Sequence, residues 1–143
     1  MKRVVLLTVT LCFILILSSC ATINAIKRMP EGSGVSKIYT YPYDKVFKAS
    51  TNTIRNLQLE IVDVSKDKGY IYAQKRGSGA QGSGEGVGIR LTQIDKDTTK
   101  VEVITRIFLM FNLTTPMDTT PYSPYNSESI FKNMEFELGE IKK

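Results

Sequence analysis

The chain has 143 residues, with 19 basic and 14 acidic side chains, a formal net charge of +5, two cysteines, and neither histidine nor tryptophan. This length suits one domain with its own core and excludes two domains of ordinary size. The lack of histidine excludes the commonest general base, the Ser-His-Asp and Cys-His arrangements and nearly all zinc sites. Basic residues are scattered along the chain, which argues against a nucleic-acid partner.

An uncharged apolar run follows the basic residues Lys2 and Arg3 and extends over residues 4–17. As a helix this run would reach only ~21 Å, short of the ~30 Å hydrocarbon core of a bilayer. A basic start, a short apolar run and small residues after it predict a signal peptide, with an uncleaved membrane anchor as the alternative.

The run ends in Leu17-Ser18-Ser19-Cys20, which resembles the lipobox of bacterial lipoproteins. The resemblance implies cleavage between Ser19 and Cys20, and a diacylglycerol thioether on Cys20 with acyl chains such as palmitate. Two or three chains would hold the protein on the membrane, where one chain would be marginal. Ala21, in place of an aspartate, implies the periplasmic face of the outer membrane.

We therefore expect three segments: a signal peptide at 1–19, a lipidated N-terminus with a flexible tether at 20–36, and a single domain at 37–143. The tether is predicted because Pro30 and Gly32 lie in a stretch with little apolar periodicity.

Strand-like alternation and helical apolar spacing follow one another through the predicted domain. Strands are expected at 37–41, 59–64, 70–75, 87–94 and 100–107. Helices are expected after an N-cap at Asp44 and after one at Ser127 or Ser129. The positions expected to face the core are Val46, Phe47, Ser50, Ile54, Leu57, Leu59, Ile61, Ile71, Ala73, Val87, Ile89, Leu91, Val101, Val103, Thr105, Ile130, Phe131, Met134, Leu138 and Ile141. These patterns predict an α+β fold, in which an antiparallel sheet of four to five strands has two helices packed on one face.

Val46-Phe47, the strand at 57–61, the turn at 67–71 and the strand at 99–103 carry a family resemblance. Their order resembles the small bacterial lipoproteins of unknown function with a single α+β domain. In layout only, it is also similar to the domains of one lipoprotein component of the outer-membrane β-barrel assembly machine. Neither resemblance implies any functional residue, and the proline-rich segment 113–126 departs from the pattern.

Two short motifs have weak links to ligand chemistry. Residues 77–82 spell G-x-G-x-x-G, but a strand rather than a helix is expected next, so a flexible loop is favoured over a nucleotide site. Asp95 and Asp97 lack the further carboxylates of a calcium loop and indicate a polar hairpin turn. We therefore expect no catalytic residue, no metal and no cofactor.

Tyrosines are the candidate interaction surface, because tyrosine supplies rigid contact area at interfaces. The residues concerned are Tyr39, Tyr41, Tyr70, Tyr72, Tyr122 and Tyr125. The alternative is that they only cover the outer face of the sheet through cross-strand pairing.

The sequence thus predicts a non-enzymatic, membrane-anchored lipoprotein that binds an envelope protein through the tyrosines or the 113–126 loop. The alternative is a periplasmic module that binds a small lipid or glycan ligand.

Overall fold

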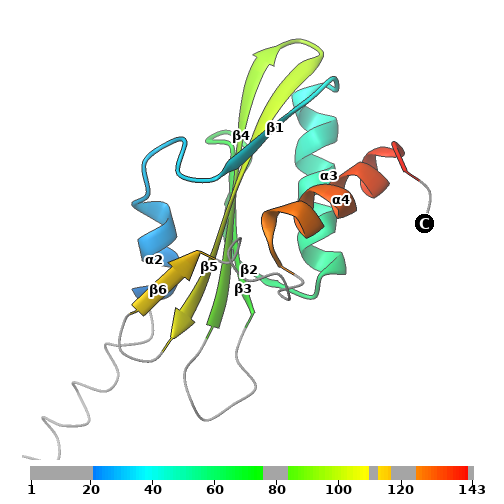
Figure 1. The fold of residues 1–143 in the computed structure, drawn as a ribbon. Helices are drawn as coiled ribbons and strands as arrows, with labels where there is room; N and C mark the ends of the chain where they lie inside the picture. Colours follow the sequence, from blue (N-terminus) through cyan, green and yellow to red (C-terminus); the bar gives the residue numbers. More distant parts are fainter. Residues whose placement is uncertain (1–20, 76–83, 110–112, 117–124, 142–143) are drawn as a thin grey trace, which may run out of the picture.

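The computed structural model describes residues 21–75, 84–109, 113–116 and 125–141. Figure 1 shows an antiparallel sheet with helices on both of its faces, which confirms the predicted α+β fold. The helices are α2 (Ala21–Lys27), α3 (Tyr43–Asn56) and α4 (Ser127–Leu138). The strands are β1 (Val35–Tyr39), β2 (Glu60–Ser65), β3 (Tyr70–Lys75), β4 (Gly84–Asp95), β5 (Thr98–Leu109) and β6 (Leu113–Pro116).

The strands run in the order β1-β5-β4-β3-β2, and β6 also pairs with β5. All pairings are antiparallel, so short turns can join β2 to β3 and β4 to β5. β1 lies opposite residues 99–103 of β5, and β6 lies opposite residues 106–109. β1 and β2 therefore form the ends of the described strand order.

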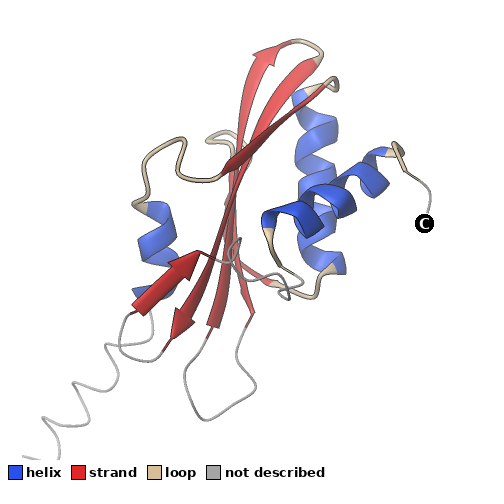
Figure 2. Cartoon of the chain, viewed as in Figure 1, coloured by secondary structure: helices blue, strands red, loops and turns tan. Residues whose placement is uncertain are grey.

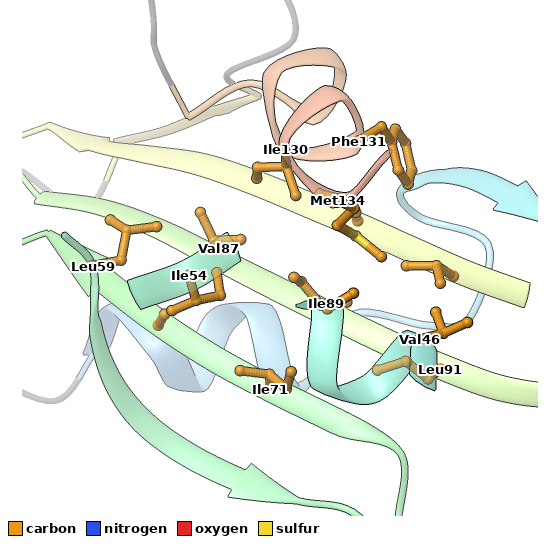
Figure 3. Close-up of a cluster of buried hydrophobic side chains, with 14 of the residues drawn as sticks. Val46, Ile54, Leu59, Ile71, Val87, Ile89, Leu91, Ile130, Phe131 and Met134 are labelled. Carbon is orange, nitrogen blue, oxygen red and sulfur yellow. The ribbon is translucent and has the colours of Figure 1, made fainter. Parts of the chain in front are cut away.

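The main core lies between the sheet and the pair α3 and α4, as the sequence predicted. Alternate residues of β3, β4 and β5 face these helices, because side chains alternate between the two faces of a strand. Val46 and Ile54 of α3 meet Ile89 and its neighbours from one side, and Met134 of α4 meets them from the other (Figure 3).

The ends of both long helices differ from expectation. Pro42 occupies the N-cap position of α3, and no side chain caps it; Asp44 lies inside the first turn. The fixed φ of proline suits the start of a helix, so a capping side chain is not required there. Asn126 caps α4 by accepting a hydrogen bond from the backbone N–H of Ser129. Ile141, expected in the core, is 36% exposed because α4 ends at Leu138.

Two further segments were predicted only in part. Residues 113–116, the start of the proline-rich segment that departs from the family pattern, form the short strand β6, which ends at Pro116, where a proline is tolerated. The glycine motif at 77–82 lies outside the described residues, and Gly84 already begins β4.

Candidate functional site

The structure corrects the predicted tether. Residues 21–27 form α2, which packs on the face of the sheet opposite α3 and α4 (Figures 1 and 2). Ile23 and Ile26 are buried there against Tyr72 and Ile104. Residues three apart share one face of a helix, so both isoleucines reach the sheet together. Fully burying each side chain contributes ~1.5–3 kcal/mol, which a free tether would forgo.

The surface that receives α2 consists of Tyr72, Gly88 and Ile104, which we call the α2 seat. These residues are partners across three neighbouring strands. A Cβ atom on Gly88 would lie 2.6 Å from Cγ2 of Ile26 and 3.2 Å from Cε1 of Tyr72. The missing side chain therefore makes the hollow into which Ile26 fits.

Arg90 holds the chain at the end of α2. Its guanidinium donates to the carbonyl oxygens of Pro30 (3.0 Å), Met29 (2.6 Å) and Ile26 (3.3 Å). The last carbonyls of a helix lack partners within the helix, and a cation stabilises them further through the helix dipole. Arg90 thus terminates α2 from a strand that lies about sixty residues further along the chain.

Glu102 holds the same segment where it joins β1. Its carboxylate is 3% exposed and accepts a hydrogen bond of 2.8 Å from the backbone N–H of Gly34. The other carboxylate oxygen lies 3.7 Å from Nη1 of Arg90, its partner across the sheet. A Cβ on Gly34 would collide with the carbonyl oxygen of Val103, so glycine is required for this close approach.

Lys27 ties α2 to the strand β2. Its Nζ is hydrogen-bonded to the Asp63 carboxylate, which also accepts from the Tyr70 hydroxyl at 3.5 Å. The hydrogen bond between the two side chains raises the pKa of Lys27 and lowers the pKa of Asp63. Both groups are therefore charged at neutral pH, and residues 21–34 are held to the sheet at three polar points as well as by the α2 seat.

A cleft of about 410 Å³ lies beside α2, against the start of β3. Lys27, Lys68 and Arg90 line it together with Glu31 and Tyr70. Its volume falls within the range of small-molecule sites, and its lining is polar.

A second hollow, of about 530 Å³, lies between the edge strand β1 and α4. Val35, Phe131 and Ile141 supply its apolar lining, and an ion pair between Lys37 and Glu135 crosses it. No described strand pairs with the outer side of β1, so its backbone is open to an added strand.

The structure does not bring the predicted tyrosines together on one surface. Tyr39 and Tyr125 are buried in the core beside α3 and α4, whereas Tyr72 is buried under α2. The sequence predicted their alternation along the strands correctly, but tyrosine can face inward as readily as outward when its ring fills the core. Burial also raises the pKa of Tyr39, whose hydroxyl has no hydrogen-bond partner among the described residues.

The remaining tyrosines divide in the same way. Tyr41 is half-buried against the main core, and Tyr70 is half-buried beside Tyr72, with ring centroids 4.9 Å apart. Tyr122 lies outside the described residues. The prediction of one tyrosine surface is therefore wrong for the described tyrosines, which pack in two separate places: the main core and the cluster under α2.

The turn with Asp95 and Asp97 is exposed, and the Asp97 N–H donates to the Asp95 carboxylate at 2.8 Å. Within residues 21–75, 84–109, 113–116 and 125–141, no three potential metal ligands group together. In the same ranges, no helix is long and apolar enough to cross a membrane.

These features define a small α+β domain with an N-terminal helix docked on the outer face of its sheet. Residues 2–107 match the family described as "Protein of unknown function (DUF3568)", and the chain belongs to this family. The match includes α2 and every residue that holds it, and it ends before α4. No protein with a curated description matches the chain.

The solved structures that resemble the fold include two weak matches. The adenylate sensor from AMP-activated protein kinase, in complex with ZMP, has a TM-score of 0.43 and 10% identity, covering 76% of this chain and 96% of the other. A DUF4468 family protein from Bacteroides ovatus has a TM-score of 0.38 and 16% identity, covering 78% and 84%. At these TM-scores neither structure informs the function.

Sequence reasoning missed the docking of α2, although two signals were present. Ile23 and Ile26 have the spacing of a helical face, and Gly88 occupies an outward position in the interior of a strand, between Val87 and Ile89. A lone glycine in a strand often marks a close approach by another part of the chain.

Proposed function

We propose that this protein is a lipid-anchored lipoprotein of the bacterial envelope that binds an envelope protein without enzymatic activity, on the periplasmic face of the outer membrane. The observation that carries the proposal is that α2 begins at Ala21, directly after the Cys20 of the lipobox-like sequence, and is docked on the domain. A lipid on Cys20 would then sit one residue from a fixed helix.

A docked α2 beside the anchor would limit how far from the membrane the domain can meet its partner. An extended tether over residues 20–34 could reach roughly 50 Å from the membrane. The docked helix instead keeps the domain at the membrane surface, so the partner must come close to the lipid. An anchored module of this kind suits a partner that is itself embedded in, or bound to, the membrane.

Labelling of the lipid tests the anchor. Cells expressing the wild-type chain are fed a palmitate analogue, and the purified protein is analysed by intact mass. We expect incorporation of the analogue and loss of residues 1–19 in the wild type, and no incorporation after Cys20→Ala. Cys12→Ala is the matched control and should still be labelled, because residue 12 lies within the predicted signal peptide. An unlabelled wild-type protein refutes the proposal.

The hollow between β1 and α4 is the described surface best suited to the protein partner. An extended segment of the partner can add to the open edge of β1 while its alternate side chains enter the apolar lining formed by Val35 and Phe131. A photo-crosslinking residue at Lys132, beside this lining, should capture the partner in cells. The same group at Arg55, exposed on α3, should capture none. Equal capture at both positions contradicts this contact surface.

The cleft beside α2 is the observation that favours the alternative, a module for a small lipid or glycan ligand. A ligand that binds only the folded state raises the thermal midpoint in proportion to its occupancy. Stabilisation of the wild type by an envelope lipid or glycan fragment, and not of Lys68→Gln, would support that alternative.

A further inference from the structure

We propose that the sheet face that carries α2 lies against anionic phospholipid headgroups, which leaves α4 and its hollow facing away from the membrane. This inference rests on the proposed anchor at Cys20. We call this surface the α2 face: the exposed side of α2, the turn between β2 and β3, and the outward residues of the sheet beside them.

Strand alternation determines which sheet residues belong to the α2 face. Tyr39 and Val101 are buried in the core with α3 and α4, so their neighbours Ile38 and Lys100 point to the other side. Ile38 and Lys100 are cross-strand partners, and Ile38 is 59% exposed. The α2 face therefore combines an exposed aliphatic side chain with an adjacent cation, a pairing that suits the interface between water and lipid.

The acids of this face are largely neutralised. Asp63 is paired with Lys27, and the buried Glu102 is paired with Arg90.

Three cations on this face, Arg28, Lys68 and Lys100, form no ion pair with any described residue. Glu31 and Asp67 are the exposed carboxylates of this face that form no ion pair among the described residues. The α2 face thus presents a local excess of positive charge.

The opposite side of the domain has no such excess of positive charge. Residues 127–141 carry Glu128, Glu135, Glu137 and Glu140 with the single cation Lys132, whereas α3 beside them carries Lys45, Lys48 and Arg55 with the single acid Asp44. Because these charges nearly cancel, an anionic lipid surface attracts the α2 face more strongly than the side of α3 and α4.

The predicted anchor places the free cations within range of the headgroups. α2 has seven residues and therefore rises ~10 Å, so Arg28 follows the anchor within about one Debye length. Each basic residue near an anionic leaflet contributes about fivefold to binding, or about 100-fold for three. If the face turned away from the membrane, screening by salt would remove most of this contribution.

The test uses the full lipidated protein in vesicles of phosphatidylcholine, with or without phosphatidylglycerol. Single cysteines at Thr92 (α2 face) or Lys132 (α4) carry an environment-sensitive fluorophore, since the one cysteine left after cleavage is acylated. We expect phosphatidylglycerol to shield the label at Thr92 from an aqueous quencher and to leave the label at Lys132 accessible.

A charge variant with a matched control isolates the cause. Arg28→Gln/Lys68→Gln/Lys100→Gln should lower the ratio of shielded to accessible protein by about 100-fold. Lys45→Gln/Lys48→Gln/Arg55→Gln removes the same charge from exposed positions of α3 and should leave the ratio unchanged.

Three outcomes overturn the proposal: shielding at Lys132, equal shielding with and without phosphatidylglycerol, or equal losses in the two charge variants. Flotation of the wild type with pure phosphatidylcholine vesicles tests the anchor separately. A protein that floats, but whose Thr92 label stays accessible in vesicles with phosphatidylglycerol, refutes the orientation alone, whereas a protein that does not float overturns both the anchor and the orientation.

Discussion

Gly88→Ala is the perturbation that addresses the docking of α2 most directly. The added methyl group would lie 2.6 Å from Cγ2 of Ile26, inside the closest approach of real Cβ atoms, and 3.2 Å from the ring of Tyr72. Ile26 is fully buried and Tyr72 is 6% exposed, so a shift of either side chain would disturb the packing between α2 and the sheet. The substitution should therefore lift α2 from its seat rather than be absorbed locally.

The expected cost follows from two opposing contributions. Overpacking a tight site costs ~1–3 kcal/mol. Replacing glycine by alanine returns ~0.4–1 kcal/mol by restricting the unfolded chain. The net effect should be a loss of roughly 1–2 kcal/mol, most of it in the free energy of docking residues 21–34 on the sheet. The open population should then rise about 5- to 30-fold.

Limited trypsin digestion reads out this opening, because Lys27 and Arg28 lie at the end of α2. The cleavage rate should rise with the open population when opening is fast relative to cleavage. Gly84→Ala is the matched control in the same strand, since its Cβ would be 3.7 Å from the nearest atom. Cleavage at the wild-type rate in Gly88→Ala would refute the reasoning.

A double variant separates the collision from any general weakening of β4. Ile26→Ala removes the Cγ2 that Gly88→Ala would strike, so the second substitution should cost little in that background. We expect a coupling free energy of about 1 kcal/mol between these contacting residues. If the losses in unfolding free energy of the two single variants simply add up in the double variant, as measured in urea, then residues 26 and 88 do not collide at the α2 seat.

Three further predictions concern polar groups. Arg90→Met should cost about 3–5 kcal/mol, because it leaves Glu102 buried without its cation; the double variant with Glu102→Gln should recover part of this loss in urea unfolding. Tyr39→Phe should match or exceed the wild type in thermal midpoint, because it removes a buried hydroxyl without a partner among the described residues; a clear loss would reveal a hidden partner. Lys27 lowers the pKa of Asp63, so the stability that this pair contributes is fully present above about pH 4 and is lost as the pH falls through the lowered pKa of that carboxylate; wild type and Asp63→Asn should converge in melts only below that lowered pKa.

The core was predictable because its signal is local and repeated. Val87, Ile89 and Leu91 alternate along one strand, and all three are buried as expected. The same holds for Ile130 and Met134, whose helical spacing alone identified the inner face of α4. Patterns of period 2 and 3.6 report directly on burial when one face of each element meets the same core.

The docking of α2 was not predictable in the same way, because a helix of seven residues is too short to be stable by itself. Its stability comes from the α2 seat and from Arg90, which contacts the carbonyl oxygen of Ile26, while Glu102 holds Gly34 further along the same segment; these contacts come from residues far away in sequence. No local pattern contains that information. The glycines and prolines around Pro30 indicated flexibility, whereas these residues shape the path of a fixed segment.

The prediction of a tyrosine interaction surface was wrong for a related reason. Alternation showed that Tyr39 and Tyr41 share a face, yet it could not tell which face is covered. On this sheet both faces are covered in part, one by α3 and α4 and the other by α2. The inward position of Tyr39 left its neighbour Ile38 exposed on the opposite side.

The fixed position of α2 changes what an anchor at Cys20 would accomplish. On a free tether the domain could rotate, and every exposed surface would have equal access to partners. With residues 21–34 held through Ile26, Arg90 and Glu102, the orientation of the sheet would be coupled to a lipid on Cys20. Weakening the seat should therefore alter partner capture at Lys132 even though α4 itself is untouched. In the photo-crosslinking experiment, Gly88→Ala should change the yield and Gly84→Ala should not; equal yields would mean that the orientation does not matter for binding.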